Sequence, residues 1–256
     1  MRVALLLGLQ SFLALTTVVF GVMALMVARR LGRSTLPSVA WLIVGIAFTL
    51  EGINGMVQSS SAIVAVLAGK ESAVWAAHLR LSPVGNHGRG VLKIGLGLAL
   101  MALPLARRVP ARVLPVLVTA WMMLFMLVGS FLGWREGSMQ AEHFSIVALL
   151  DSFEMIVIWG ALIGALYTGG IDRLLWVGLA LNGVRQALNV VWTSALVWRD
   201  TPGAWVPSVT TMQLYACAVL LFMIFLARKR LRLARQGVPV PGLLDVLLSP
   251  QPRMLS

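Results

Sequence analysis

The sequence contains few charged residues and only one cysteine. Of its 256 residues, 12% are charged and 59% are hydrophobic, whereas typical soluble domains have about 25% charged residues. Together with a mean hydropathy of +0.89, this composition excludes an ordinary soluble globular domain. The single cysteine, Cys217, allows no intramolecular disulfide and no cysteine-based zinc site.

Short segments of alternating polarity, which a transmembrane barrel requires, are also missing, because the apolar runs are long and continuous. The backbone of a lipid-embedded segment must satisfy its own hydrogen bonds, so each run predicts a helix. A spanning helix takes about 20 residues. Seven runs are candidates: 3–28, 37–66, 90–106, 111–133, 144–168, 174–198 and 207–227. The sequence therefore predicts an all-α integral membrane protein with seven transmembrane helices.

The basic residues lie mostly beside the apolar runs, and their distribution predicts an orientation. Thirteen Lys and Arg residues fall after the first, third and fifth helices and in the C-terminal tail, against six on the other side. By the positive-inside rule, the N-terminus is outside and the C-terminus is inside. We expect an integral protein of a bacterial-type cytoplasmic (inner) membrane. The first run ends in Arg29-Arg30 instead of a cleavage site, so we expect that helix to be retained.

The net charge of +12 suggests an anionic partner. Because the cations flank apolar runs, that partner is expected to be membrane lipid and not nucleic acid. Residues 227–236 continue the last helix as a basic strip, which we expect to contact anionic lipid.

Two helices share a spaced pattern of polar residues. Trp41, Glu51, Asn54 and Ser59 have the same spacing as Trp176, Gln186, Asn189 and Ser194. Gln10-Ser-Phe and Asp151-Ser-Phe match in the first and fifth helices, and Leu105-Ala-Arg-Arg and Leu226-Ala-Arg-Lys match in the third and seventh. These matches favour a parallel 3+1+3 repeat. The units would be residues 1–108, linker helix 109–134, residues 135–230 and a basic cytoplasmic tail, 231–256.

This topology resembles that of the SWEET and PQ-loop transporters, which also place parallel three-helix repeats around a linker helix. The resemblance covers topology alone, because the first, second, fifth and sixth helix interiors lack the prolines that those families use as hinges. A retinal-binding protein is excluded, since residues 206–227 contain no lysine for a Schiff base. We expect no cofactor.

Polar residues three, four and seven apart share a helix face. Such stripes give a set of candidate residues for ligand binding or proton coupling: Glu51, Asn54, Asp151, Glu154, Asn182, Arg185, Gln186 and Asn189. With the orientation above, the polar residues lie from the midplane outward, and the inner half is nearly all apolar. The sequence therefore predicts a polar cavity in the outer half of the bilayer.

Charged groups within a membrane are costly, so these side chains should face one another or water. Arg185 is interpreted as the only interior cation near three carboxylates. One reading is structural: Arg185 pairs with Glu51 or Glu154, and the amides join helices. The other is a solute or ion site, in which the surplus carboxylates take up a proton or a cation.

A metal site is a sharper alternative. His78, His87 and His143 fall on the external side, within reach of Asp151 and Glu154, and His87 and His143 are the weak candidate ligands. His87 falls in the connection from Lys70 to Arg89, which we interpret as the longest external loop. No close His-x-x-x-His spacing supports the site.

Three functions follow from these features. The first is a small carrier for a polar or anionic solute, possibly proton-coupled, whose Arg185 orients the solute. The second is a non-enzymatic receptor or sensor, or an accessory subunit that needs a membrane-protein partner. The third is an intramembrane metal-dependent hydrolase. An enzyme is the less favoured class.

The predicted orientation can be tested with reporter fusions. Green fluorescent protein fused to the C-terminus should fluoresce, because that end is predicted to be cytoplasmic. Alkaline phosphatase fused after residue 140 should be active, because the connection between the fourth and fifth helices is predicted to lie outside. A dark C-terminal fusion together with an inactive phosphatase fusion would contradict the orientation.

Overall fold

The computed structural model describes residues 2–32, 35–136, 143–168, 170–197 and 209–237, and side chains are described for most of them. These residues form seven α-helices and one short 3-10 helix. Their bounds are α1 Arg2–Leu31, α2 Leu36–Ala68, α3 Ala73–Met101, η1 Leu103–Arg108, α4 Leu114–Glu136, α5 His143–Thr168, α6 Arg173–Val197 and α7 Val209–Arg235. The prediction of an all-helical chain is confirmed for the described residues.

Five helical stretches are long and apolar enough to cross a membrane. They are Leu5–Leu31, Leu36–Ala68, Leu114–Arg135, Arg173–Val191 and Thr210–Arg235, and α5 contributes a shorter apolar stretch, Ser152–Ala165. The apolar helices indicate a multi-pass membrane protein. α3 is absent from this set because its polar residues, among them Arg80, Arg89 and Lys93, lower its hydropathy.

The prediction of a loop from Lys70 to Arg89 is wrong. α3 begins at Ala73, where the hydroxyl of Ser72 accepts a hydrogen bond from the Trp75 backbone N–H at 3.1 Å and caps the helix. Pro83 lies inside α3, although proline usually ends a helix. At its other end α3 stops at Met101, so residues 103–108 form η1 and do not extend a third span to residue 106.

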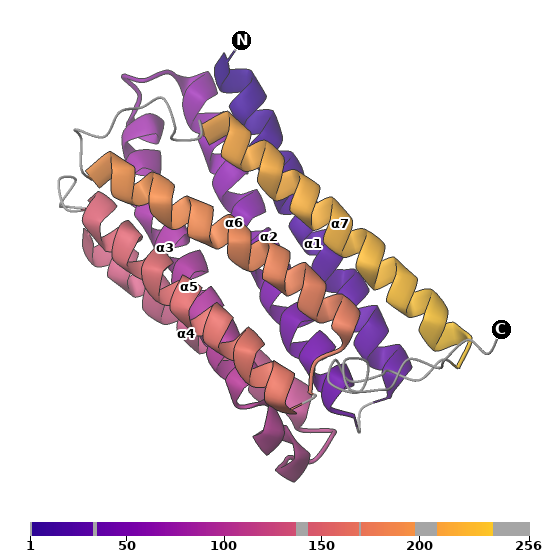
Figure 1. Ribbon diagram of the computed structural model, residues 1–256. Helices are drawn as coiled ribbons and strands as arrows, with labels where there is room; N and C mark the ends of the chain where they lie inside the picture. The colour runs from indigo at the N-terminus through magenta and orange to yellow at the C-terminus, as the bar shows by residue number, and fades with distance from the viewer. Residues whose placement is uncertain (1, 33–34, 137–142, 169, 198–208, 238–256) are drawn as a thin grey trace.

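Six helices form a closed ring. Going around it, α1 contacts α2, α2 contacts α3, α3 contacts α5, α5 contacts α6, α6 contacts α7, and α7 returns to α1. Figure 1 shows α1, α2 and α7 on one side and α3 and α5 on the other, with α6 running obliquely across the front between them. Each contact in the first half of the chain has a counterpart in the second: α1–α2 with α5–α6, α2–α3 with α6–α7, and α3–α5 with α7–α1.

The α1–α2 pair is held together at glycines. A Cβ atom at Gly52 would lie 2.6 Å from the backbone nitrogen of Val18, so only glycine permits this approach. Gly32, directly after α1, has a φ of +82°, a region that favours glycine. Thr35 then caps α2 by accepting a hydrogen bond from the Ser38 N–H at 3.4 Å.

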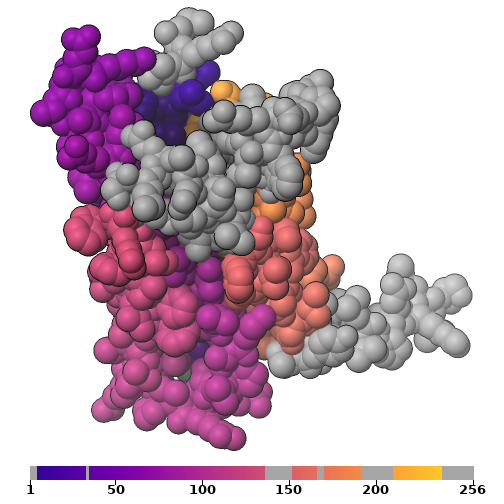
Figure 2. Space-filling view, turned by 90° about the vertical axis from the view of Figure 1, so that its left-hand side faces the viewer, coloured from indigo at the N-terminus to yellow at the C-terminus, as the bar shows by residue number. Residues whose placement is uncertain are grey.

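α4 stands outside the ring and packs mainly against α3. Gly129 and Gly133 face the α3 backbone at His87 and Pro83, where a side chain would collide with carbonyl oxygens. In Figure 2, α4 is the pink helix on the face turned to the viewer. Its outward residues are apolar, and Leu127, Phe131 and Trp134 are all more than half exposed. Such a surface suits contact with lipid.

A buried ion pair joins three helices near the end of the bundle where α1 finishes and α2 begins. Oδ2 of Asp172 accepts a hydrogen bond from Trp41 Nε1 at 3.1 Å and lies 2.9 Å from Arg230 Nε. Its Oδ1 accepts from the Leu174 N–H at 3.0 Å, so Asp172 also caps α6. The carboxylate therefore links α2, α6 and α7.

This pairing corrects the interpretation of the basic strip. Arg230 was expected to contact anionic lipid, but its side chain is only 2% exposed because it turns inward to Asp172. The neighbouring Arg228, Lys229, Arg232 and Arg235 are exposed.

Breaking this ion pair should destabilise the protein. Asp172→Asn keeps the shape of the side chain but leaves the charge of Arg230 uncompensated, which costs about 3–5 kcal/mol for a buried pair. We expect a lower apparent Tm for Asp172→Asn in detergent and a partial recovery when Arg230→Met is added. Arg232→Met, on the exposed side of α7, is the control. An Asp172→Asn variant as stable as the wild type would show that the pair is not structural.

Candidate functional site

A cavity of about 490 Å³ lies inside the ring of six helices. Its walls come from α1, α2, α3, α5, α6 and α7, and none of the lining residues belongs to α4. The charged and amide-bearing residues that line it are Gln10, Glu51, Gln58, Asn86, Arg89, Lys93, Glu154, Asn182, Arg185, Gln186, Asn189 and Gln213. The volume falls within the range typical of small-molecule sites, about 300–1,000 Å³.

Lys93 is the centre of the charged part of the cavity. Its Nζ lies 3.3 Å from Oε1 of Glu51 and 3.3 Å from Oε1 of Glu154, so one ammonium bridges carboxylates from α2 and α5. Glu154 is only 1% exposed. The interpretation of Arg185 as the only interior cation is therefore wrong, since Lys93 makes the ion pairs proposed for it and Arg89 also lines the cavity.

The cavity ends near the middle of the bundle. On α1, α2 and α7, the lining residues closest to the Asp172 end are Thr17, Phe48 and Leu220. Between Phe48 and the Asp172 end, the interior is apolar. The rings of Phe48 and Phe20 pack edge to face with 4.9 Å between their centroids, and Phe20 is 1% exposed. Fully buried side chains continue the layer toward Asp172, among them Trp41, Leu96, Leu179 and Met223.

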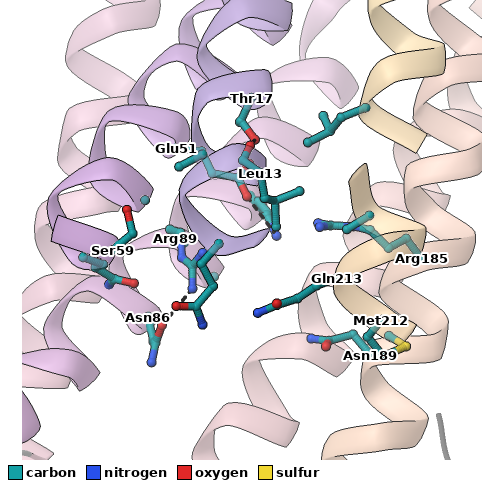
Figure 3. Close-up of a pocket in the computed structure, with 18 of the residues that line it drawn as sticks. Leu13, Thr17, Glu51, Ser59, Asn86, Arg89, Arg185, Asn189, Met212 and Gln213 are labelled. Atoms are coloured by element: carbon teal, nitrogen blue, oxygen red, sulfur yellow. Dashed lines mark hydrogen bonds and ion pairs between the residues drawn. The ribbon is translucent and has the colours of Figure 1, made fainter. Parts of the chain in front are cut away.

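Residues of α6 and α7 form the wall opposite Glu51. Figure 3 shows Arg185 and Gln213 reaching into the cavity from these helices, while Glu51 and Arg89 stand on the other side. Arg185 and Arg89 line the same cavity as Glu51. Gln186 lines the same cavity and is 2% exposed. Glu51 and Gln186, which occupy equivalent places in the repeated pattern, thus both face the interior.

Two predicted site residues, Asn54 and His87, stand apart from this group. Asn54 is not among the lining residues, because its Nδ2 donates to the Gly85 carbonyl at 2.8 Å and joins α2 to α3. His87 is buried beside α4, with Nδ1 2.8 Å from the Pro83 carbonyl oxygen. The side chains of Asp151 and His143 lie outside the described residues. Of the eight predicted ligand-binding residues, Glu51, Glu154, Asn182, Arg185, Gln186 and Asn189 line the cavity.

Sequence reasoning assigned several cavity-lining residues of α3 to the external loop and so missed their place in the cavity. Asn86 and Arg89 line the cavity and are joined by a hydrogen bond from Arg89 Nη2 to Asn86 Oδ1 at 2.8 Å. His78 also lines it, and its Nδ1 lies 3.1 Å from Ser61 Oγ. The signal that would have found them is their spacing: residues 78, 82, 86, 89 and 93 recur every three or four positions, as on one helix face.

The described residues contain no group of three or more His, Cys, Asp or Glu side chains that could hold a metal ion. The site they do form is a polar cavity between six helices, with charges of both signs. The chemistry that these walls offer to a small molecule is ion pairing and hydrogen bonding.

Removing Lys93 should destabilise the bundle. In Lys93→Gln, Glu51 and Glu154 lose the cation between them, and a buried charge without its partner costs several kcal/mol. We expect a lower apparent Tm in detergent, and a higher one when Glu154→Gln is added, because one carboxylate is then neutral. Lys70→Gln, at an exposed position, should match the wild type. A Lys93→Gln variant of unchanged stability would contradict the bridging role.

Known proteins supply no family for this chain: no protein-family model, curated protein or solved structure matches it. The apolar helices indicate a multi-pass membrane protein, and the described residues are all-helical. Its function has to be inferred from the cavity.

Proposed function

We propose that the protein is a membrane carrier for a small polar or anionic solute, which binds in the cavity between the two sets of three helices. The observation that carries this proposal is the position of the cavity. It is enclosed by six helices, lies in one half of the bundle, and stops at an apolar layer below Phe48. A solute site near the middle of two helical units, open toward one side only, is typical of alternating-access carriers.

In this proposal the charged residues have two roles, which are solute binding and proton coupling. Arg185 holds the solute from α6, and the amides of Gln186 and Asn189 bond its polar groups. The Lys93 bridge is the site of a coupling proton. A proton taken up by Glu51 or Glu154 removes one of the two charges that hold Lys93, and this loosens the contact among α2, α3 and α5.

The proton site also has neighbours that set its charge balance. Besides Lys93, the cations that line the cavity with Glu51 are Arg89 on α3 and Arg185 on α6. The cavity-lining residues of α1 and α7 contribute no ionisable side chain. Protonation of one carboxylate would therefore raise the net positive charge of a cavity that already contains three cations. A negatively charged solute in the cavity would offset this increase and favour protonation.

A receptor or accessory subunit is the second candidate. The apolar layer favours it, because Trp41, Leu96 and Met223 are buried between the cavity and the Asp172 ion pair and offer no polar path. In that function the site binds a ligand, and the signal passes to a membrane-protein partner.

Anionic lipid is the proposed partner of the basic end. The described residues there include ten exposed cations: Arg29, Arg30, Arg107, Arg108, Arg112, Arg173, Arg228, Lys229, Arg232 and Arg235. Each cation near an anionic membrane surface contributes about 1 kcal/mol to the attraction. This arrangement supports a location of that end at the cytoplasmic leaflet.

Transport can be measured in proteoliposomes loaded with a pH-sensitive dye. We expect saturable uptake of at least one of lactate, phosphate or glycerol above that of protein-free liposomes, accompanied by a proton signal if uptake is coupled. Glu51→Gln should lower the uptake rate at least about tenfold, which is about 1.4 kcal/mol. The matched control is Glu71→Gln, because Glu71 is exposed outside the cavity.

The two candidate functions give different results in this assay. Ligand binding without any flux would contradict the carrier and support the receptor. Uptake that is the same in Glu51→Gln and in wild type would remove the proposed role of the carboxylates.

A further inference from the structure

The charges around the cavity do not cancel. Among the described lining residues, the cations are Arg89, Lys93 and Arg185, and the carboxylates are Glu51 and Glu154. Three positive charges against two negative ones leave an excess of one positive charge. Because Lys93 is engaged with both carboxylates, the excess resides on the two arginines.

Several buried polar atoms around the cavity also lack a hydrogen-bond partner in the structure. They are Arg185 Nε, Gln186 Nε2, Gln58 Nε2 and Gln213 Oε1. Gln186 is the most informative of these residues, because its side chain is only 2% exposed and lines the cavity. A buried polar group without a partner costs about 1–3 kcal/mol. Three of these four atoms are donors, which indicates a ligand rich in acceptor oxygens.

The apolar parts of the lining complete the description of the ligand. Leu13, Ala14, Met212 and Ala216 face the cavity from α1 and α7. A bare inorganic ion would leave these surfaces and most of the 490 Å³ without contact. An organic molecule with a short carbon skeleton would contact them while its oxygens meet the amides on α2, α6 and α7.

We propose that the ligand of this cavity is a small organic monocarboxylate that carries at least one further hydroxyl or carbonyl oxygen. Arg185 holds the carboxylate, since a planar guanidinium matches its two oxygens. Gln186 donates to the additional oxygen, and the α1 and α7 side chains contact the carbon skeleton. One negative charge neutralises the excess of the lining, whereas a dianion would exceed it. This inference rests on the proposed carrier function and narrows its solute.

Thermal-shift titration of the detergent-purified protein tests the ligand class, because a ligand of the folded state raises the apparent Tm by mass action. The probes are the monocarboxylates lactate, pyruvate and gluconate, the neutral amide lactamide, the dianion succinate and inorganic phosphate. We expect a saturable rise in Tm with at least one monocarboxylate and a response at least about tenfold weaker, as apparent Kd, with its neutral or divalent counterpart.

Variants assign the binding to Arg185. Arg185→Gln should weaken the monocarboxylate response at least about tenfold, and Arg185→Lys should restore part of it, since the charge returns without the planar geometry. Gln186→Ala provides a second variant if Arg185→Gln does not fold. Arg173→Gln is the control, because Arg173 is exposed at the basic end.

Three outcomes would overturn the inference: no response to any monocarboxylate, an equal response to lactamide, or unchanged binding in both Arg185→Gln and Gln186→Ala. Proteoliposome flux separates this failure from that of the carrier. Flux of glycerol or phosphate without monocarboxylate binding contradicts the ligand class and leaves the carrier. Monocarboxylate binding without flux supports the ligand class and contradicts the carrier.

Discussion

The central constraint on this protein is that charge inside a membrane must be paired. Lys93 satisfies it by lying 3.3 Å from both Glu51 and Glu154, so that α2, α3 and α5 meet at one ammonium. The contact fixes the part of the cavity that lies toward the apolar layer, because Lys93, Glu51 and Glu154 also line the cavity. The remaining helices of the ring, α1, α6 and α7, then close the cavity and bring Arg185 to face the bridge.

A second paired charge stabilises the opposite end. Asp172 joins Trp41, Arg230 and the first turn of α6, and the side chains of Asp172, Trp41 and Arg230 are buried. Between the two ion clusters lies the apolar layer that contains Phe20 and Met223. The molecule is thus polar and hollow in one half, apolar and filled in the middle, and tied by an ion pair at the basic end. This difference between the two halves is the basis for interpreting the protein as a carrier whose solute site is open toward one side of the membrane.

Much of this organisation could be predicted from the sequence, because it depends on long runs and helical spacing. The helices around Glu51 and Arg185 were predicted from apolar length, and the cavity-facing amides from residues three and four apart. α3 was misjudged because Pro83 and the polar residues before it are typical of a loop. That error hid Arg89 and separated Lys93 from the carboxylates. Pairing of Asp172 with Arg230 depends on tertiary contacts between distant segments, which spacing along one helix does not reveal.

The most direct test of this account is the charge preference of a thiol reagent inside the cavity. In a Cys217→Ser background, Ala62→Cys places a thiol in the lining, and Ala76→Cys places one on the exposed surface of α3. An anionic and a cationic methanethiosulfonate of similar size are compared at both positions. The excess positive charge predicts that the ratio of anionic to cationic rates is at least about tenfold higher at residue 62 than at residue 76. Equal ratios, or a faster cationic reagent at residue 62, would contradict an anion-binding cavity.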